Sequence, residues 1–365
     1  MSGRTALIYH ERYSGRGTSP ISQAWLRYQQ TWDLVEELGM FDNGLLHYRP
    51  EPATDEDLLR AHTPGYLQQV MEADVRGYGF LDYGDTPAYP GVDVRSRLAV
   101  GGTLLAARRI AGGTISHAFN PAGGLHHARS DRAGGFCVFN DIVIAARTLR
   151  DEGLDRIAIV DIDGHHADGT QALLYDEPIL KISVHMYDRL FYPGTGAVAE
   201  VGRGPGEGYS VNIPLRRRTG NSAYRQAFDE IVVPVLRDYQ PQFIINQFGV
   251  DAHYQDPLVG LWLTTDAFRQ IAETLHNLAH ELCEGRLLVL GGGGYDPRNV
   301  ARCWTIMLGT ISGAVPEESQ ADFEALFDTE GPRTDDRAEA QVQKVIQEVK
   351  RRIFPLRGLS EHGSR

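Results

Sequence analysis

The amino-acid sequence predicts an α/β protein with a doubly wound, mostly parallel sheet and helices on both faces. Segments with helical patterns alternate along the chain with short apolar runs, as in folds built from a covered parallel sheet. These runs are rich in β-branched residues and contain few polar positions, which is typical of strands buried on both faces. Two of them end abruptly in aspartate and histidine, and in open α/β sheets ligands bind at the carboxyl ends of strands.

Length and composition narrow the class of protein. The chain has 365 residues and is expected to form one large domain over 1–365, since α/β folds of more than roughly 250 residues commonly form a single domain. Its net charge of -12 argues against binding to nucleic acid, which needs a basic face. Three widely spaced cysteines indicate a reducing compartment without disulfides or a thiolate zinc site. No apolar run reaches the ~18 residues of a membrane span or forms a signal peptide, so we expect no membrane partner and a cytoplasmic location.

The first part of the chain is expected to alternate between elements and loops. Gly39 is a helix stop for the segment before it, and the stretch over 77–91 is too rich in Gly, Pro and Tyr for a regular element. The expected order is a strand over 6–9, a loop over 13–20, helices over 21–39, 55–62, 64–74 and 95–110, and a strand over 115–119.

The second part continues the same alternation. The glycine-rich run over 202–208 is not a phosphate-binding loop, because it lacks the Gly-Lys-Ser/Thr ending and leads into a strand. A C-terminal extension over 336–353 has an apolar stripe at helical spacing that should dock on the core, which we place at 7–313, and the tail over 358–365 should be frayed. The expected elements between them are strands over 157–160, 180–185, 209–214, 243–248 and 287–290, an aromatic loop over 187–196, and helices over 140–150, 222–238 and 267–283.

Metal-competent side chains follow the strand over 157–160. Asp161, Asp163 and His165 stand at i, i+2 and i+4, so in an extended backbone they project to one side. A buried carboxylate costs several kcal/mol unless it is paired or bound to metal. Taken singly, Asp161 can be a helix N-cap and His165 or His166 a buried core histidine. As a set at the end of a core strand, these residues favour a metal site.

Other strand ends supply compatible groups. Asp251 follows the strand over 243–248, and Tyr295 follows four glycines after the strand over 287–290. Two carboxylates and one histidine suit Zn²⁺ or Fe²⁺ acting as a Lewis acid. The pair His126 and His127 can move protons if carboxylates such as those of Asp161 and Asp168 orient them. Tyr295 can donate a hydrogen bond to a developing oxyanion.

The motifs that contain these residues resemble those of the histone deacetylase family, including its bacterial acetoin-utilisation deacetylase branch. They occur in the family's order, and the resemblance covers about 7–308. They are Gly-Leu-His-His-Ala at 124–128, Gly-Phe at 135–136, Asp-Ile-Asp-Gly-His-His-Ala-Asp-Gly at 161–169, Tyr-Pro-Gly-Thr-Gly at 192–196, Asp-Ala-His-Tyr-Gln-Asp-Pro at 251–257 and Gly-Gly-Gly-Gly-Tyr at 291–295.

The resemblance implies an arginase-like deacetylase fold and metal-dependent hydrolysis of an acylated amine. It implies Asp163, His165 and Asp251 as ligands of Zn²⁺, with Fe²⁺ as the alternative metal. His127 would be the base and acid oriented by Asp168, His126 would pair with Asp161, and Tyr295 would stabilise the oxyanion. It also implies a potassium ion near the same loop, and the residues assigned to it are Asp161, Asp163, His165, Ser183 and Val184.

The resemblance further implies a substrate tunnel. Phe136, next to Gly135, and Tyr192 would wall the tunnel, and Asp85 would accept hydrogen bonds from the substrate backbone. Taken singly, Phe136 and Tyr192 can equally be core aromatics. The chain departs from the family pattern by small changes at Gly164 and Ala167, and it has Tyr192 where phenylalanine is commoner.

The sequence bears on three rival functions. An arginase-like ureohydrolase needs a second carboxylate two residues after Asp251, and that position is His253. An acetylpolyamine deacetylase would have an acidic gatekeeper where this chain has Leu258. A catalytically silent acyl-lysine binder would lack a ligand, a histidine or the tyrosine, and none is missing. We therefore expect an acyl-lysine protein or peptide as substrate, with a small acylated amine as the alternative; the sequence does not indicate the oligomeric state.

Overall fold

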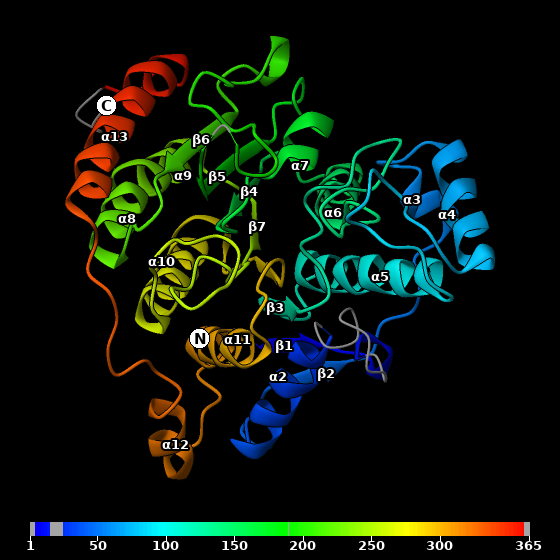
Figure 1. Cartoon of the computed structure of the whole chain (residues 1–365). Coiled ribbons are helices and arrows are strands. Elements are labelled where there is room, and N and C mark those ends of the chain that lie inside the picture. Colours follow the sequence, from blue (N-terminus) through cyan, green and yellow to red (C-terminus); the bar gives the residue numbers. More distant parts are fainter. Residues whose placement is uncertain (1–3, 15–24, 189, 361–365) are drawn as a thin grey trace.

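The computed structural model describes residues 4–14, 25–188 and 190–360 and has one sheet at its centre (Figure 1). All neighbouring strands in it run parallel. This confirms the predicted α/β class and makes the sheet fully, rather than mostly, parallel. In spatial order its eight strands are β2 (Leu46–Tyr48), β1 (Thr5–Ile8), β3 (His117–Asn120), β8 (Leu287–Leu290), β7 (Phe243–Gln247), β4 (Ile157–Asp161), β5 (Leu180–Met186) and β6 (Ser210–Leu215).

Both faces of the sheet are buried against helices, as Figure 1 shows. In β4, Ala158 and Val160 belong to one apolar cluster and Ile157 and Ile159 to the other, so alternate residues face opposite layers. This is why the strand has no polar position before Asp161. The first layer contains α2 (Leu26–Glu37), α8 (Asn221–Ala227), α9 (Val233–Tyr239), α10 (Thr265–Cys283), α11 (Pro297–Ser312) and α13 (Asp336–Leu356), and the second contains α4 (Pro64–Arg76), α5 (Val92–Ala111) and α6 (Asp141–Asp151).

The expected strands and helices are present with small shifts of their ends, and two expectations need correction. The helix expected over 55–62 is only α3 (Asp55–Leu58), which begins with a capping box between Thr54 and Asp57. The helix expected over 222–238 is divided by a π-helical turn, Phe228–Val232. Most of the loop over 13–20, the start of the helix over 21–39 and most of the tail over 358–365 lie outside the described residues.

Several elements were not anticipated. They are β2, α7 (Asp168–Leu173), α11, α12 (Gln320–Glu324) and 3-10 turns at Glu11–Tyr13, Gly204–Gly206 and Glu317–Ser319. The start of α11 did carry a signal, because Asp296 caps the backbone amides of Arg298 and Asn299 and Pro297 occupies the first turn. None of the described helices combines the length and hydropathy needed to cross a bilayer.

The C-terminal helix α13 lies against the edge strand of the sheet. It contacts β6 and α8, and the side chain of Asp335 caps its first turn. The buried residues of this helix include Val342, Val345, Ile346, Val349 and Ile353. The apolar stripe of α13 therefore covers β6, which has a neighbouring strand on one side only.

Candidate active site

The candidate site lies where four neighbouring strands end. The loop after β4 carries Asp163 and His165, the loop after β7 carries Asp251, the loop after β8 carries Tyr295, and the loop after β3 carries His126 and His127. Because β3, β8, β7 and β4 are adjacent and parallel, their carboxyl ends share one edge. The sheet thus brings together groups that are far apart in the sequence.

The three predicted metal ligands form a compact buried cluster. His165 Nδ1 is 2.9 Å from Asp251 Oδ2 and 3.2 Å from Asp163 Oδ1. One ligand atom from each residue lies within 4.8 Å of the others. The spacing read from the sequence therefore corresponds to a real constellation.

Hydrogen bonds orient the two carboxylates of this cluster. Gln247 Nε2 and the Gly293 amide each donate to Asp163 Oδ2 over 2.7 Å, and the Gly164 amide donates to Asp251 Oδ1 over 2.6 Å. In each carboxylate the other oxygen faces His165. The role of Gln247 was missed from the sequence, although a glutamine ending an apolar strand is a signal for a polar contact.

The electrostatics of the cluster suit a cation. Burial, followed by the nearby charge of Asp163, raises the pKa of Asp251 to about 7. Burial alone would lower the pKa of His165, but its hydrogen bonds to Asp163 and Asp251 and their charges raise it to about 10. Two carboxylates held together out of water call for positive charge between them. The donors, two carboxylates and one imidazole, fit Zn²⁺ or Fe²⁺.

Two carboxylate-bound imidazoles lie beside the cluster. His126 Nδ1 is 2.8 Å from Asp161 Oδ2, and His127 Nδ1 is 2.7 Å from Asp168 Oδ1. The Nε2 atoms of the two histidines are 3.0 Å apart. Arg129 donates to the other oxygen of Asp168 over 2.7 Å. Both pairings expected from the sequence are present in the structure, and Arg129 is an addition to them.

The two imidazoles differ in protonation. Burial would lower the pKa of His126, but the Asp161 and Asp163 carboxylates outweigh it and raise the value to about 9. Burial, followed by the neighbouring His126, lowers the pKa of His127 to about 4 despite its bond to Asp168. At neutral pH His127 is therefore the unprotonated imidazole, which is the form that a general base requires.

Gly135 leaves the space that the His127 ring occupies. Its φ is +51°, and a Cβ there would lie 2.2 Å from His127 Cδ2. We expect Gly135→Ala to displace the imidazole. The kcat of the acylated-amine hydrolysis that the sequence resemblance implies should then fall roughly 10²-fold, the cost of a misplacement of about 1 Å. Gly134→Ala is the matched control, since its Cβ would come no closer than 3.3 Å, to the Tyr192 hydroxyl. Steady-state kinetics and thermal unfolding of both variants test this, and equal losses of kcat would contradict it.

Tyr295 faces the predicted metal ligands from the loop after β8. Its ring centroid is 6.3 Å from that of His165, and its amide donates to Asp256 Oδ2 over 2.9 Å. Burial, followed by the charges of Asp251 and Asp163, raises the pKa of Tyr295 well above its usual value. The phenol therefore keeps its proton and remains a hydrogen-bond donor. Asp256, part of a motif in the sequence, has the structural role of anchoring the Tyr295 backbone.

A cavity of about 590 Å³ reaches this site. Its wall includes His127, Phe136, Asp163 and Tyr295, and it also includes Arg27. Arg27 donates to the Gly294 carbonyl over 3.0 Å, so it supports the glycine run before Tyr295. The cavity joins the predicted ligand, base and tyrosine in one accessible space.

Aromatic residues surround the entrance side of the site. Phe136 is 56% exposed and Tyr192 41% exposed, and the Tyr192 ring lies 4.9 Å from that of His127. Phe191, which is not among the predicted site residues, stacks on His165 with ring centroids 4.9 Å apart. Its only sequence signal was its place in the aromatic loop.

The remaining predicted residues lie near the site, and their contacts do not bear on the roles assigned to them. Asp85 Oδ1 accepts from the Gly135 amide over 3.2 Å, so this carboxylate supports the turn before Phe136. Leu258 is 45% exposed, and its amide donates to Asp256 Oδ1. Ser183 pairs in register with Asp161 and precedes Val184. Substrate contacts by Asp85 and Leu258 and potassium binding near Ser183 stay predictions.

Comparisons with known proteins show the family of this chain. Residues 23–311 match the histone deacetylase domain. The chain is 37% identical over 303 residues to the acetoin utilization protein AcuC of Bacillus subtilis, covering 79% of this chain and 78% of that protein. It is 36% identical over 296 residues to a probable deacetylase of Archaeoglobus fulgidus, covering 80% and 81%. The crystal structure of the HDA15 HD domain superposes with a TM-score of 0.83 at 27% identity, covering 97% of each chain. The chain belongs to the histone deacetylase family.

Proposed function

We propose that this protein hydrolyses the amide of N6-acetyl-lysine in a protein or peptide in the cytoplasm. The observation that carries the proposal is the arrangement around the buried cluster of Asp163, His165 and Asp251. Two carboxylate-bound imidazoles and a protonated tyrosine surround that cluster at one end of an aromatic-walled cavity. These are the parts that metal-assisted hydrolysis of an amide requires.

Asp163, His165 and Asp251 would hold the metal ion, which we propose to be Zn²⁺, with Fe²⁺ as the alternative. When bound, the ion supplies a Lewis acid for the amide carbonyl and lowers the pKa of water. We also propose a potassium ion at Asp161, Asp163, His165, Ser183 and Val184. The support for it is that β5 lies beside this loop, where the Met186 amide donates to the Gly164 carbonyl.

His127 performs the proton transfers in this proposal. Its Nδ1 is bound to Asp168, so Nε2 is the atom that accepts a proton, and to do so it must leave its 3.0 Å contact with His126 Nε2. Nε2 takes one proton from the attacking water and later delivers it to the departing amine nitrogen, so that a free lysine amine and acetic acid form, and the acid then loses its own proton to water to give acetate. His126, with its raised pKa and its bond to Asp161, keeps a positive charge beside this base.

Tyr295 stabilises the oxyanion formed when water adds to the amide carbonyl. Its hydroxyl stays protonated because the site is buried and already negative. A preorganised donor of this kind acts more strongly in the transition state than on the ground-state carbonyl. The hydrogen bond from the Tyr295 amide to Asp256 holds its backbone in place.

The entrance favours acyl-lysine over an acylated polyamine. The exposed aromatic rings of Phe136 and Tyr192 suit the aliphatic stem of lysine. Leu258, which stands where the polyamine-selective branch of the family has an acidic gatekeeper, offers no charge to the distal amine of a polyamine. We therefore assign selectivity for a peptide-borne amine to the apolar rim.

The proposed function is tested by measuring amine release from an acetyl-lysine peptide and from an N-acetylated polyamine. Metal-stripped enzyme is reconstituted with Zn²⁺ or Fe²⁺, and Asp251→Asn serves as the metal-site control. We expect turnover only with metal, a higher kcat/KM for the peptide, and no metal-dependent turnover by Asp251→Asn. Preference for the polyamine would contradict the assigned substrate. If neither compound is turned over, the protein deacetylates neither acetyl-lysine peptides nor acetylated polyamines, and the proposed function is contradicted.

A further inference from the structure

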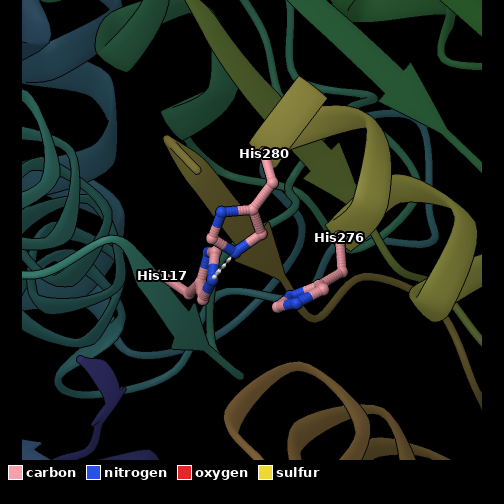
Figure 2. Close-up of side chains that lie close together, drawn as sticks. All are labelled: His117, His276 and His280. Atoms are coloured by element: carbon pink, nitrogen blue, oxygen red, sulfur yellow. Dashed lines mark hydrogen bonds between the residues drawn. The ribbon is translucent and has the colours of Figure 1, made fainter. Parts of the chain in front are cut away.

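Three histidines from two elements meet at the end of the sheet opposite the active site. His117 is the first residue of β3, whereas the active-site loops follow the last residues of the strands. His276 and His280 lie on α10, which packs against β7 and β8. Figure 2 shows the three rings turned toward one another between β3 and α10. None of these residues takes part in the proposed hydrolysis.

The spacing of the nitrogens suits one metal ion. His276 and His280 are four residues apart, so they lie on the same face of α10. The Nε2 atoms of His117 and His280 are 3.2 Å apart, and two nitrogens on one tetrahedral Zn²⁺, each about 2.0–2.1 Å from it, are roughly 3.3 Å apart. One nitrogen from each histidine lies within 4.8 Å of the other two.

The surroundings of the cluster also point to a ligand. His117 is fully buried, and its Nδ1 and that of His276 are buried without a hydrogen-bond partner. Such unpaired polar atoms are uncommon in folded proteins. The unpaired buried nitrogens of His117 and His276 therefore point to a ligand in this cluster.

The chain leaves room for the rings and an entry path. Gly285, just after α10, has a φ of +81°, and a Cβ there would lie 2.9 Å from His280 Cε1. His280 is exposed and His276 half-buried, so an ion can reach the cluster from solvent. The site is therefore closed on the sheet side by His117 and open on the helix side.

We propose that His117, His276 and His280 form a second metal site that binds a divalent transition metal ion through three imidazole nitrogens. Imidazole ligands suit Zn²⁺, Cu²⁺ and Ni²⁺ and disfavour Mg²⁺ and Ca²⁺. The ion joins β3 to α10 through residues 163 positions apart in the sequence. An ion that binds only the folded state stabilises that state, so this site would be structural. It lies at the end of the sheet opposite the active site and therefore does not supply the catalytic metal.

The test measures Zn²⁺ bound to the full chain. Metal-stripped protein is dialysed against Zn²⁺ alone and analysed for bound metal. We expect about two equivalents in the wild type and about one in either Asp251→Asn or His280→Gln, as independent sites require. Asn277→Gln is the matched control, because Asn277 is an exposed neighbour on α10 outside the histidine cluster; it should keep both equivalents.

A second measurement identifies the ligands. Cu²⁺ bound to Asp251→Asn should give an electron paramagnetic resonance signal with nitrogen hyperfine structure, and Zn²⁺ should raise the Tm of this variant. Both effects should be lost when His280→Gln is added. If that double variant does not fold, adding His276→Asn to Asp251→Asn provides the same comparison.

The outcomes separate this site from the catalytic one. A single Zn²⁺ in the wild type that His280→Gln retains, or a Tm shift of Asp251→Asn that survives the loss of the histidines, would overturn the second site. A single Zn²⁺ that is lost in His280→Gln and kept in Asp251→Asn would support the second site and count against the catalytic ligand assignment instead.

Discussion

His127→Ala is expected to lower kcat for an acetyl-lysine peptide by roughly 10²- to 10⁴-fold, the usual contribution of a general acid and base. The variant removes the only nitrogen that we assign to both proton transfers. His126 cannot replace it, because the Asp161 and Asp163 carboxylates keep that imidazole protonated. Steady-state kinetics with the Zn²⁺-loaded enzyme measures the loss.

The bound metal separates this effect from damage to the site. His127 is not a member of the cluster of Asp163, His165 and Asp251, so elemental analysis should find the same Zn²⁺ content at that site in His127→Ala as in the wild type. The control is His47→Ala, which removes an exposed imidazole on β2 and should leave kcat within about threefold of normal, as changes at exposed positions usually do. A kcat of His127→Ala within tenfold of wild type would contradict the assignment.

Tyr295→Phe should lower kcat by roughly 10²- to 10³-fold with little change in KM, which is the usual cost of removing one oxyanion donor. The change deletes one oxygen and keeps the ring. The backbone bond from the Tyr295 amide to Asp256 does not depend on the hydroxyl, so the fold and metal content should be unchanged. The measurements are kcat, KM, Tm and bound Zn²⁺.

Tyr192→Phe is the matched control for the tyrosine prediction. The Tyr192 ring also lies beside His127, and the change likewise deletes one hydroxyl from the site. It converts the residue to the phenylalanine that is commoner in the family, so we expect kcat to change by less than about threefold, well below the cost of losing an oxyanion donor. A similar loss in both variants would show that a hydroxyl near the entrance, rather than the oxyanion contact, is what catalysis requires.

The proposed second metal site could be predicted from the sequence only in part. His276 and His280 stand at helical spacing in a helix that was predicted correctly, so their common face was visible in the sequence. His117 is 159 positions before the nearer of them, and a pair of histidines on a helix is not by itself a metal site. Only the packing of β3 beside β8 and under α10 places the third imidazole against the other two.

Strands were predictable to different extents for a physical reason. β4 is buried on both faces, so every position before Asp161 must be apolar and the run is unmistakable. β2 has three residues that are exposed or half-buried, and it lies at an edge of the sheet. An edge strand with little buried surface has no strong pattern, and it was missed. α11 was missed although Asp296 and Pro297 marked its start.

By itself, the sequence determined the parallel α/β class and the positions where strands give way to Asp, His and Tyr. It did so because these follow from local patterns: unbroken apolar runs, spacing along an extended backbone and glycine-rich turns. The tertiary structure alone decided that Gln247 and the Gly293 amide orient Asp163, that Arg129 binds Asp168 and that Phe191 stacks on His165. It also decided which imidazole is neutral, because a pKa depends on burial and on charges that only the fold brings within range.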